Sequence, residues 1–431
     1  MRPERIDWDG SDPRRLAERL RALQPGLDEV SDAVAEIVAS VASGGDEAVL
    51  DAERRFGGCA PADLVVGRDE LEAARDAIAA DLRDAIELAE RNVRRVAEAE
   101  AEADLRVTLE QGQSVRLRSV PVRSAGAYAP GGTASYPSSA LMCTVPAAVA
   151  EVERIAVASP PGEDGRIDPV VLAAAAIGGA GRAFATGGAQ AIAAMALGTE
   201  SIDPVDVVVG PGNRFVQEAK RQLSGRVGID GVAGPSELMV VFDESAELRW
   251  LALDLCAQGE HGDDGLLVAV SDDAERLSEI ERLVAELAPE RDSVASPPIA
   301  FITAPSSEAA LELANELAPE HLQIACEQDL SAAVTTAGCV FVGGDSAAAF
   351  GDYAAGSNHV LPTGGAGRFT GPLGPSTFRR RMATVRVTHE AARELAGPVA
   401  TLAHIEGFPV HGESVEARRD ERVDDPDRGK N

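Results

Sequence analysis

Short apolar runs alternate with helical segments along much of the sequence, and glycine or proline marks most of the turns between them. "RIAVASPP" at 154–161 precedes "DPVVLAAAAIGG" at 168–179, and "VDVVVGPGN" at 205–213 precedes "RFVQEAKRQLS" at 214–224. Strand-like runs that alternate with helical patterns in this way are typical of parallel sheets joined by crossover helices. We therefore predict an α/β fold built on parallel sheets.

The alternation falls into two blocks, residues 126–236 and 237–350. The second block contains the runs "ELMVVFD", "LLVAVSDD", "PIAFIT" and "CVFVGG". Amphipathic helical patterns cover 31–42 and 69–100, and we expect them to pack with the second block. The expected parts of the chain are an N-terminal segment (1–20), a first α/β domain (21–125 with 237–375), a second α/β domain (126–236), a C-terminal helical segment (376–420) and a disordered acidic tail (421–431).

The charge of the chain argues against two classes of partner. Asp and Glu outnumber Lys and Arg by 71 to 40, the formal net charge is −31, and Lys220 and Lys430 are the only lysines. Such a field repels nucleic acid and anionic membrane surfaces. The acids are spread along the chain, so two explanations stay open: an acidic face that binds a partner, or a cytoplasm with very high salt that screens self-repulsion. We favour the high-salt environment.

The sequence also predicts a cytoplasmic protein. Its five cysteines show no CxxC spacing, which indicates free thiols in a reducing compartment. The first residues, "MRPERIDWDG", lack the apolar core of a signal peptide. No apolar run is long enough to cross a membrane.

Three glycine-rich loops follow strand-like runs in the first block: "YAPGG" at 128–132, "TGGAQ" at 186–190 and "GPGN" at 210–213. Glycine lets backbone N–H groups approach a phosphate, and the helix that follows contributes its positive end. The dinucleotide fingerprint GxGxxG is absent, because Phe215 stands where the third glycine would fall. Each loop alone favours a plain turn, whereas the three together leave nucleotide binding and plain turns equally open.

Histidines occur beside acids, amides or glycine in three further motifs. Their residues are Gln258 and His261 in "AQGEHG", Glu320 and His321 in "APEHLQI", and Asp352 and His359 in "GDYAAGSNHV". Taken singly, each motif favours a structural role: a helix C-terminus, a solvated acid beside a capping histidine, or a flexible connector. Taken together, nitrogen and oxygen ligands without a thiolate suit Zn²⁺ or a similar divalent ion. A histidine beside a carboxylate also suits general acid–base work.

In their residues and in their order along the chain, these motifs resemble those of the histidinol dehydrogenase family. The resemblance runs through most of the chain. It rests on "YAPGG", "TGGAQAIAAMALGTES" (186–201), "VDVVVGPGNRFVQEAKRQLSG" (205–225), "AGPSE" (233–237), "AQGEHG", "APEHLQ", "GDYAAGSNHVLPTGGAGRF" (351–369) and "EGFPVH" (406–411).

The resemblance implies a homodimer with two incomplete Rossmann-like domains, similar to aldehyde dehydrogenases, in which residues 126–236 contact NAD and the C-terminal segment reaches the partner's site. It implies one Zn²⁺ per subunit, held by Gln258, His261, Asp352 and, from the partner subunit, His411. Glu320 and His321 would be the acid–base pair. The NAD contacts would be Tyr128, Gln190 and Asn213. The substrate contacts would be Ser236, His359 and Glu406, together with His321 and the zinc ligands.

The implied reaction is the oxidation of L-histidinol through L-histidinal to L-histidine with two NAD⁺, the last step of histidine biosynthesis. An alternative within the same scaffold is a paralogue that oxidises another small alcohol. Two hypotheses from other classes are a zinc hydrolase that uses Glu320 with a metal-bound water, and a salt-adapted binding protein without catalysis. The hydrolase would need no NAD⁺, and the binding protein leaves the motifs unexplained.

Overall fold

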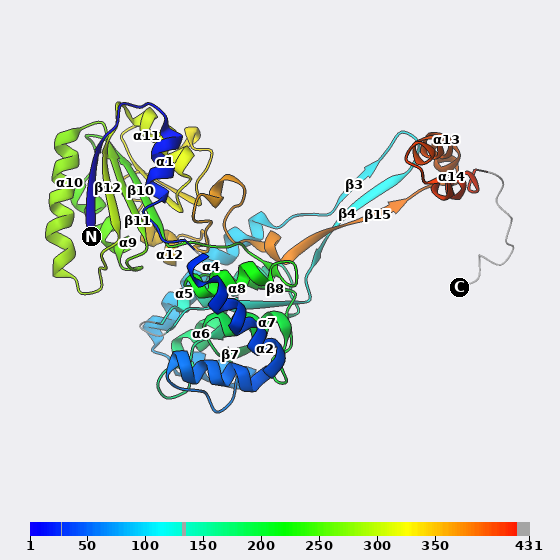
Figure 1. The fold of residues 1–431 in the computed structure, drawn as a ribbon, viewed down its shortest axis with the longest axis horizontal. Coiled ribbons are helices and arrows are strands. Elements are labelled where there is room, and N and C mark those ends of the chain that lie inside the picture. The colour runs from blue at the N-terminus through cyan, green and yellow to red at the C-terminus, as the bar shows by residue number, and fades with distance from the viewer. Residues whose placement is uncertain (27, 132–134, 420–431) are drawn as a thin grey trace. The chain divides into compact units, whose positions relative to one another are not determined.

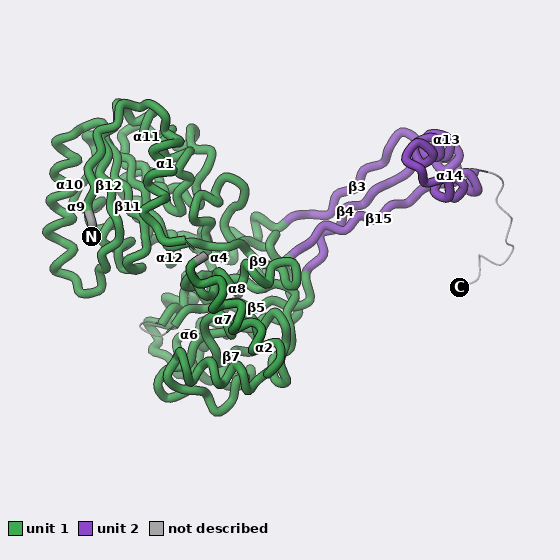
Figure 2. The backbone as a smooth tube through the Cα atoms, in the orientation of Figure 1, with its two compact units in different colours: residues 1–101, 122–378 green, residues 102–121, 379–431 purple. Residues whose placement is uncertain are grey.

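The computed structural model describes residues 1–26, 28–131 and 135–419. The chain divides into two compact units (Figure 2), the first formed by Met1–Ala101 with Val122–Phe378 and the second by Glu102–Pro121 with Arg379–Asn431. The tail for which disorder is predicted, 421–431, lies outside the described residues. Within the described residues no helix is long and apolar enough to cross a membrane.

The first unit contains two six-stranded sheets (Figure 1). In sheet A every strand pair is parallel. Its order is β1 (Arg2–Asp7), β12 (Pro298–Thr303), β11 (Leu266–Ser271), β10 (Glu237–Phe242), β13 (His321–Ala325) and β14 (Cys339–Val342). The chain moves outward from β10 through β11 to β12 and then returns to the other side of β10, so the strand order reverses between β10 and β13.

The helices that belong with sheet A are α1 (Pro13–Arg21), α9 (Leu248–Gly259), α10 (Ala274–Leu287), α11 (Ser307–Leu317) and α12 (Ala348–Tyr353). α1 packs beside α11, and α9 packs beside α10. Residues of the first pair share one hydrophobic cluster with the sheet, and residues of the second pair share another. Side chains of strands alternate between faces, so both faces of sheet A are covered.

Sheet B has the order β2 (Val65–Val66), β7 (Arg182–Ala185), β6 (Arg154–Ser159), β5 (Ser124–Tyr128), β8 (Val207–Val209) and β9 (Gly228–Ile229). Only β2 runs antiparallel to its neighbour. Its helices are α2 (Ser31–Ala52), α3 (Arg68–Ala77), α4 (Ala80–Glu100), α5 (Pro137–Val149), α6 (Pro169–Gly178), α7 (Gly188–Leu197) and α8 (Arg214–Leu223). The strand order reverses between β5 and β8, as it does between β10 and β13.

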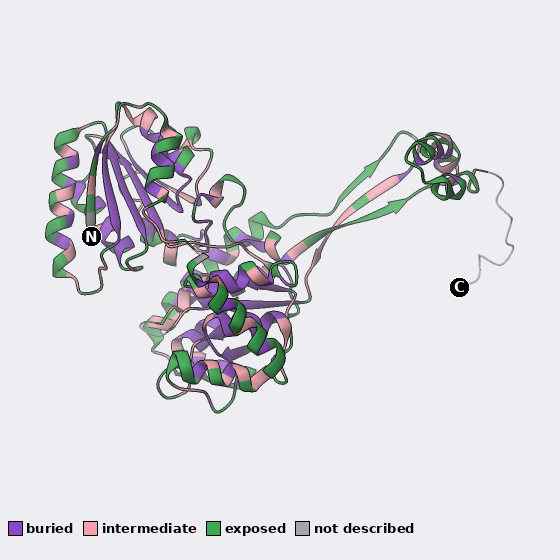
Figure 3. Ribbon diagram, in the orientation of Figure 1, coloured by how far each residue is buried: buried purple, intermediate pink, exposed green. Residues whose placement is uncertain are grey.

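The predicted α/β class with parallel sheets is confirmed. The central strands of both sheets are buried (Figure 3), and their cores are built from Ala, Val, Leu and Ile with few aromatic side chains. One detail differs: α2, α3 and α4 pack against sheet B, although we expected the helices of 21–125 to accompany sheet A. An amphipathic pattern shows that a helix has a buried face, but not which sheet covers that face.

The second unit contains a three-stranded antiparallel sheet of β3 (Leu105–Thr108), β4 (Ser114–Pro121) and β15 (Arg379–Arg386), followed by α13 (His389–Ile405) and α14 (Pro409–Glu416). Helices are present in the C-terminal segment 376–420, as expected. β15 was not expected in this helical segment. Its sequence "RRRMATVR" alternates charged and apolar residues only weakly, and its pairing partner β4 is distant in the sequence.

Candidate active site

Glu320 and His321 lie at the junction between α11 and β13. The helix ends at Leu317, and Ala318 has a left-handed conformation (φ +47°) that turns the chain out of the helix. His321 is then the first residue of β13, a strand that the sequence pattern did not predict. The two residues expose only 6% and 3% of their surface. Neither is therefore the solvated acid or surface cap that the motif alone would favour.

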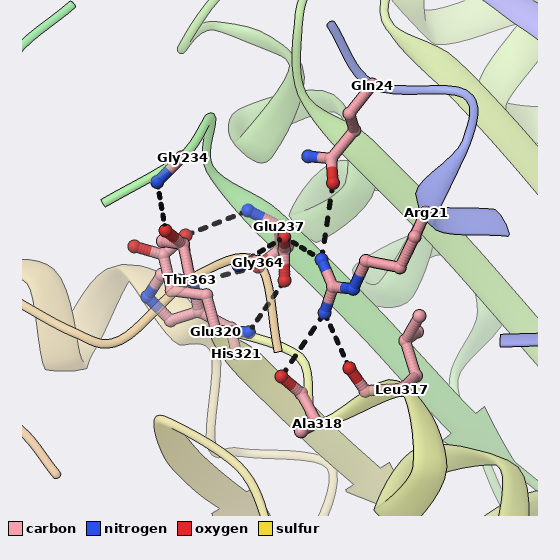
Figure 4. Close-up of polar contacts among 10 residues, drawn as sticks. All are labelled: Arg21, Gln24, Gly234, Glu237, Leu317, Ala318, Glu320, His321, Thr363 and Gly364. Carbon is pink, nitrogen blue, oxygen red and sulfur yellow. Dashed lines mark hydrogen bonds and ion pairs between the residues drawn. The ribbon is translucent and has the colours of Figure 1, made fainter. Parts of the chain in front are cut away.

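A second buried acid, Glu237, joins this pair (Figure 4). It begins β10, the strand beside β13. Its backbone N–H donates to Oε2 of Glu320 at 2.8 Å, and the backbone N–H of Glu320 donates to Oε2 of Glu237 at 3.2 Å. The other oxygen of Glu237 accepts from the guanidinium of Arg21 and, at 3.0 Å, from the backbone N–H of Gly364. Burial raises the pKa of the Glu237 carboxyl, and Arg21 opposes that shift.

The ring of His321 is held at both nitrogens. Nδ1 lies 3.1 Å from the backbone carbonyl of Glu237, which can only accept, so Nδ1 carries a hydrogen. Nε2 lies 3.2 Å from Oδ1 of Asp352, and the ring stacks on Phe341 with centroids 5.8 Å apart. Burial disfavours the imidazolium, but the carboxylates of Glu320 and Asp352 outweigh it. The pKa of His321 therefore lies well above its ordinary value.

Asp352 and His359 lie close together, and the local structure differs from the flexible connector that the motif alone favours. Asp352 lies in the last turn of the short helix α12 rather than in a loop. Burial tends to raise the pKa of its carboxyl, yet the hydrogen bond and charge of His321 hold that pKa below its usual range. Nδ1 of His359 lies 2.7 Å from the backbone carbonyl of Asp352, and Nε2 lies 3.3 Å from Oγ of Ser139 on α5. His359 thus joins the end of α12 to a helix of sheet B.

Gln258 and His261 lie at the end of α9, which touches α12. Gln258 is buried, and its Nε2 has no hydrogen-bond partner among the described residues. His261 is exposed just beyond the helix end, near enough for its charge to lower the pKa of Asp352. A buried N–H donor without an acceptor is costly unless a ligand supplies one. The amide nitrogen of Gln258 is therefore available as a donor to a bound ligand.

No group of three or more His, Cys, Asp or Glu side chains is arranged to hold a metal within 1–26, 28–131 and 135–419. The set implied by the resemblance takes only two such side chains, His261 and Asp352, from one subunit. It adds an amide from the same chain and a histidine from a second copy. The zinc site accordingly stays a prediction.

The three residues for which NAD contacts are predicted lie at the carboxyl ends of strands in sheet B. Tyr128 ends β5, Gln190 lies in the first turn of α7 after β7, and Asn213 caps α8 after β8. Tyr128 and Asn213 follow the two strands between which the strand order reverses, where ligands commonly bind in open α/β sheets. Burial raises the pKa of Tyr128 to about 12, so its hydroxyl stays protonated near neutral pH.

A buried carboxylate, Glu53, fixes the loop before α7. Its Oε1 accepts from Oγ1 of Thr186 at 2.7 Å, from the backbone N–H of Gly187 at 2.8 Å and from Nε2 of Gln190 at 2.8 Å. The next backbone N–H, of Gly188, donates to the hydroxyl of Tyr128 at 3.0 Å. Protein groups thus occupy the first amides of α7, and this loop is not the open phosphate cradle that its glycines suggested.

The remaining predicted substrate contacts are divided between the units. Ser236 precedes Glu237 at the start of β10, and its carbonyl accepts from the backbone N–H of Leu266 at 3.1 Å. Glu406 and His411 belong to the second unit, at the end of α13 and in α14, and both are exposed. His411 lies beside Phe408, with ring centroids 5.3 Å apart.

Sequence reasoning missed Arg21, Glu53 and Glu237. Glu237 stood in the sequence only as the last letter of "AGPSE" and the first letter of "ELMVVFD", and neither Arg21 nor Glu53 stands in a recognisable motif. Their partners lie 216, 137 and 83 positions away in the sequence. A search for acids at the start of predicted parallel strands would have found Glu237, but no local pattern marks the other two.

The fold and the site define an α/β enzyme: an acid–imidazole pair lies at one edge of one parallel sheet, and glycine-rich loops lie at one edge of the other. The sequence profile described as histidinol dehydrogenase matches residues 22–419. A histidinol dehydrogenase of Halobacterium salinarum is 45% identical over 403 residues, which cover 91% of this chain and 94% of the relative. One of Pseudomonas fluorescens is 41% identical and covers 93% and 92%.

The crystal structure of a histidinol dehydrogenase from Elizabethkingia anophelis matches with a TM-score of 0.87 and 29% identity. The match covers 97% of this chain and 98% of that one. The chain therefore belongs to the histidinol dehydrogenase family, as the motifs predicted.

Proposed function

We propose that this protein oxidises L-histidinol to L-histidinal and then to L-histidine, using two NAD⁺ in succession. The observation that carries the proposal is the buried pair Glu320–His321, in a chain that belongs to this family. The ring of His321 also faces Asp352. A buried imidazole of fixed tautomer beside a carboxylate suits proton transfer from an alcohol.

The polar atoms left over at sheet B suit a dinucleotide. The hydroxyl of Tyr128 accepts from Gly188 and keeps its hydrogen for a ligand. Oδ1 of Asn213 accepts from the backbone N–H groups of Phe215 and Val216, which leaves its NH₂ group as a donor. Nε2 of Gln190 is engaged by Glu53, which leaves its oxygen as an acceptor. Two donors and one acceptor match the hydroxyl, phosphate and carboxamide groups of NAD⁺.

The residues at the end of α9 and in α12 fit Zn²⁺. Gln258, His261 and Asp352 offer an amide oxygen, an imidazole nitrogen and a carboxylate oxygen, and α9, which carries Gln258, touches α12, which carries Asp352. His411 of the partner subunit would complete four ligands, the usual number for zinc. Zinc, when bound, would supply orientation by holding the imidazole and amino nitrogens of the substrate.

The proton transfers fall to the buried pair. His321 takes the hydroxyl proton as the first hydride leaves for the nicotinamide. Histidinal stays bound while NADH is exchanged for NAD⁺. Glu320 then activates a water that hydrates the aldehyde, and His321 is again the base for the second hydride transfer. Because the pKa of His321 is raised, its neutral form increases with pH, and turnover should rise as the solution becomes alkaline.

We propose a homodimer with shared sites. The second unit exposes a row of large apolar side chains on α13, α14 and their connection, including Leu402 at 61%, Ile405 at 80% and Val410 at 69% exposure. Apolar patches of this kind commonly mark protein interfaces. The same segment carries Glu406 and His411, which would then reach the substrate and the metal of the partner subunit.

Shared sites can be tested by mixing two inactive variants. Asp352→Ala and His411→Ala each remove one ligand of every site. A mixed dimer has one site that lacks both ligands and one that keeps all four, so activity should return to about a quarter of the wild-type value at equal mixing. A mixture that stays inactive, with mixed dimers shown by mass spectrometry, contradicts the shared site.

We also propose that the protein works in high salt, a finer point that rests on the net charge of −31 and its even spread. At about 1 M salt the Debye length is roughly 3 Å, which removes most repulsion between surface acids. Dialysis to low salt should abolish structure, measured by circular dichroism. An unchanged spectrum and activity would contradict the proposal.

One assay decides among the candidate functions. Purified protein in high salt is mixed with L-histidinol and NAD⁺, and NADH is followed with and without a chelator. We expect two NADH per histidinol and loss of turnover after metal removal. NADH from another small alcohol, but not from histidinol, would indicate the paralogue. No NADH from any alcohol would leave the hydrolase or the binding protein.

A further inference from the structure

Glu237 is a buried carboxylate that the proposed reaction does not use. It exposes 1% of its surface, and it contacts both residues of the acid–base pair. Its carboxylate accepts from the backbone N–H of Glu320, and its backbone N–H donates to the carboxylate of Glu320. Its backbone carbonyl accepts from Nδ1 of His321. One residue therefore fixes the carboxylate of Glu320 and the tautomer of His321.

Arg21 connects Glu237 to the chain that leads into the pair. The guanidinium donates to Oε1 of Glu237, to the backbone carbonyl of Leu317 at 2.6 Å and to that of Ala318 at 3.3 Å (Figure 4). Leu317 and Ala318 are the end of α11 and its left-handed cap. The helix that carries Arg21, α1, packs against α11. Arg21 thus contacts both Glu237, which neighbours the Glu320–His321 pair, and the turn at Leu317 and Ala318 that leads into the pair.

We propose that Arg21 and Glu237 are positioning residues for Glu320 and His321, and that the positive charge of Arg21 lets the carboxylate of Glu237 stay buried beside that of Glu320. The inference rests on the proposed function. Glu237 acts by direct hydrogen bonds to the pair, and Arg21 acts through Glu237 and the α11 turn. Neither contacts the substrate in this assignment.

The charges explain why Arg21 and Glu237 should behave as a unit. Without Arg21, Glu237 is a buried carboxylate with no cation bonded to it, beside the second carboxylate of Glu320. Breaking one side of a buried ion pair is more damaging than removing both partners, because the remaining charge loses its compensation. A neutral amide at position 237 removes that excess charge and keeps its one oxygen as an acceptor for either Gly364 or Glu320, whose N–H groups now bind different oxygens of Glu237. A variant without either charge should therefore be better than one without Arg21 alone.

The experiment is a charge-deletion cycle with Arg21→Met, Glu237→Gln and the double variant. Both half-reactions are measured at saturating NAD⁺, together with both KM values and the melting temperature. We expect Arg21→Met to lower kcat for histidinal oxidation about 100-fold, the cost typical of a displaced reactive group, with the KM for NAD⁺ within about two-fold. Glu237→Gln should lose about 10-fold, and the double variant should recover most of the loss caused by Arg21→Met.

Arg19→Met is the matched control. Arg19 lies on the same helix and pairs with Glu4 at the surface, so its loss should change kcat by less than about two-fold. Arg21→Lys keeps the charge with fewer donors and should fall between wild type and Arg21→Met. It also keeps the cycle informative if Arg21→Met does not fold, because Arg21→Lys and Glu237→Gln are the milder variants.

Two results would overturn the proposal. One is a folded Arg21→Met or Arg21→Lys protein with both half-reactions at the wild-type rate. The other is a double variant whose loss is the product of the two single losses, because independent structural damage multiplies. A wild-type protein that forms no NADH from histidinol would instead reject the proposed function. In that case the melting temperatures decide: additive shifts in the cycle reject the charge unit, and a double variant more stable than Arg21→Met supports it.

Discussion

Sheets A and B have the same architecture, but their candidate functional residues lie at opposite ends of the strands. Each has six strands and reverses its strand order beside a central strand, at β10 and β13 in sheet A and at β5 and β8 in sheet B. In sheet B the candidate residues follow the carboxyl ends of strands, as expected for open α/β sheets. In sheet A, Glu237 and His321 are the first residues of their strands, so the candidate chemistry lies at the amino ends.

The two edges also differ in charge. The edge of sheet A gathers Glu237, Glu320, His321 and Asp352, and the pKa values of three of them are shifted. The predicted cofactor contacts of sheet B are a phenol and two amides, held by backbone groups and by Glu53. Groups that exchange protons need tuned pKa values, whereas groups that only bind a cofactor need fixed donors and acceptors. We therefore expect variants at sheet A to lower kcat and variants at sheet B to raise the KM for NAD⁺.

The largest effect should come from His321→Asn. The amide can take one hydrogen-bonding role of the ring but cannot accept a proton, so both half-reactions lose their base. General base catalysis typically contributes 10²- to 10⁴-fold, and we expect kcat to fall about 1000-fold in each half-reaction, with little change in the KM for NAD⁺. Steady-state kinetics with histidinol and with histidinal measure this. A variant that keeps one half-reaction near the wild-type rate contradicts a shared base.

Glu320→Gln should divide the two half-reactions. The carboxylate is assigned to the water that hydrates the aldehyde, so histidinal oxidation should fall about 100-fold and histidinol oxidation much less. The amide keeps an oxygen for the backbone N–H of Glu237, which preserves the local structure. Single-turnover assays of each step give the ratio. Equal losses in both steps would show that Glu320 does not have a separate task.

Sheet B is tested by Glu53→Ala, with Glu53→Gln as the matched control. Alanine removes the acceptor of three hydrogen bonds and releases the side chain of Gln190, so the KM for NAD⁺ should rise about 10-fold while kcat changes little. Buried donors without an acceptor cost about 1–3 kcal/mol each, so the melting temperature should also fall. Glutamine keeps one oxygen at this place and should stay within about three-fold of wild type. A fall in kcat with unchanged KM would remove the contrast between the two edges.

The sequence predicted much of the two-sheet fold but few of the contacts between its side chains. Apolar runs bounded by turn residues are a local signal, and such runs correspond to the strands β6, β7, β8, β10, β11 and β12. β13 was missed because "PEHLQIA" starts with the polar pair that defines the site and resembles a helix end. The histidine motifs indicated Glu320, His321 and Asp352 as candidates, but their individual roles came from the resemblance. Glu53 and Arg21 could not be inferred, because their roles arise only when segments more than 100 positions apart meet.

The smallest effect is expected at Asp254, where we ask whether a buried acid near the sheet A site takes part in the reaction. Asp254 lies on α9, four residues before Gln258, and its Oδ2 accepts from Nε2 of Gln323, two residues after His321. Burial raises the pKa of Asp254 above its usual value, which the bond from Gln323 opposes. A raised folded-state pKa favours folding below the unfolded pKa, and this contribution is lost as pH rises through the folded pKa. At neutral pH the charged carboxylate therefore costs stability.

Asp254→Asn should remove that cost without touching the reaction. The oxygen of Gln323 is buried and without a hydrogen-bond partner among the described residues, so the new amide can donate to it while its own oxygen accepts from Nε2. One added hydrogen bond contributes about 1 kcal/mol, and the gain should be present at pH 7 and absent near pH 3. Denaturant unfolding at both pH values measures it. A change in kcat greater than about two-fold would mean that Asp254 acts together with the charged residues at the amino ends of the sheet A strands and is not only a buried structural residue.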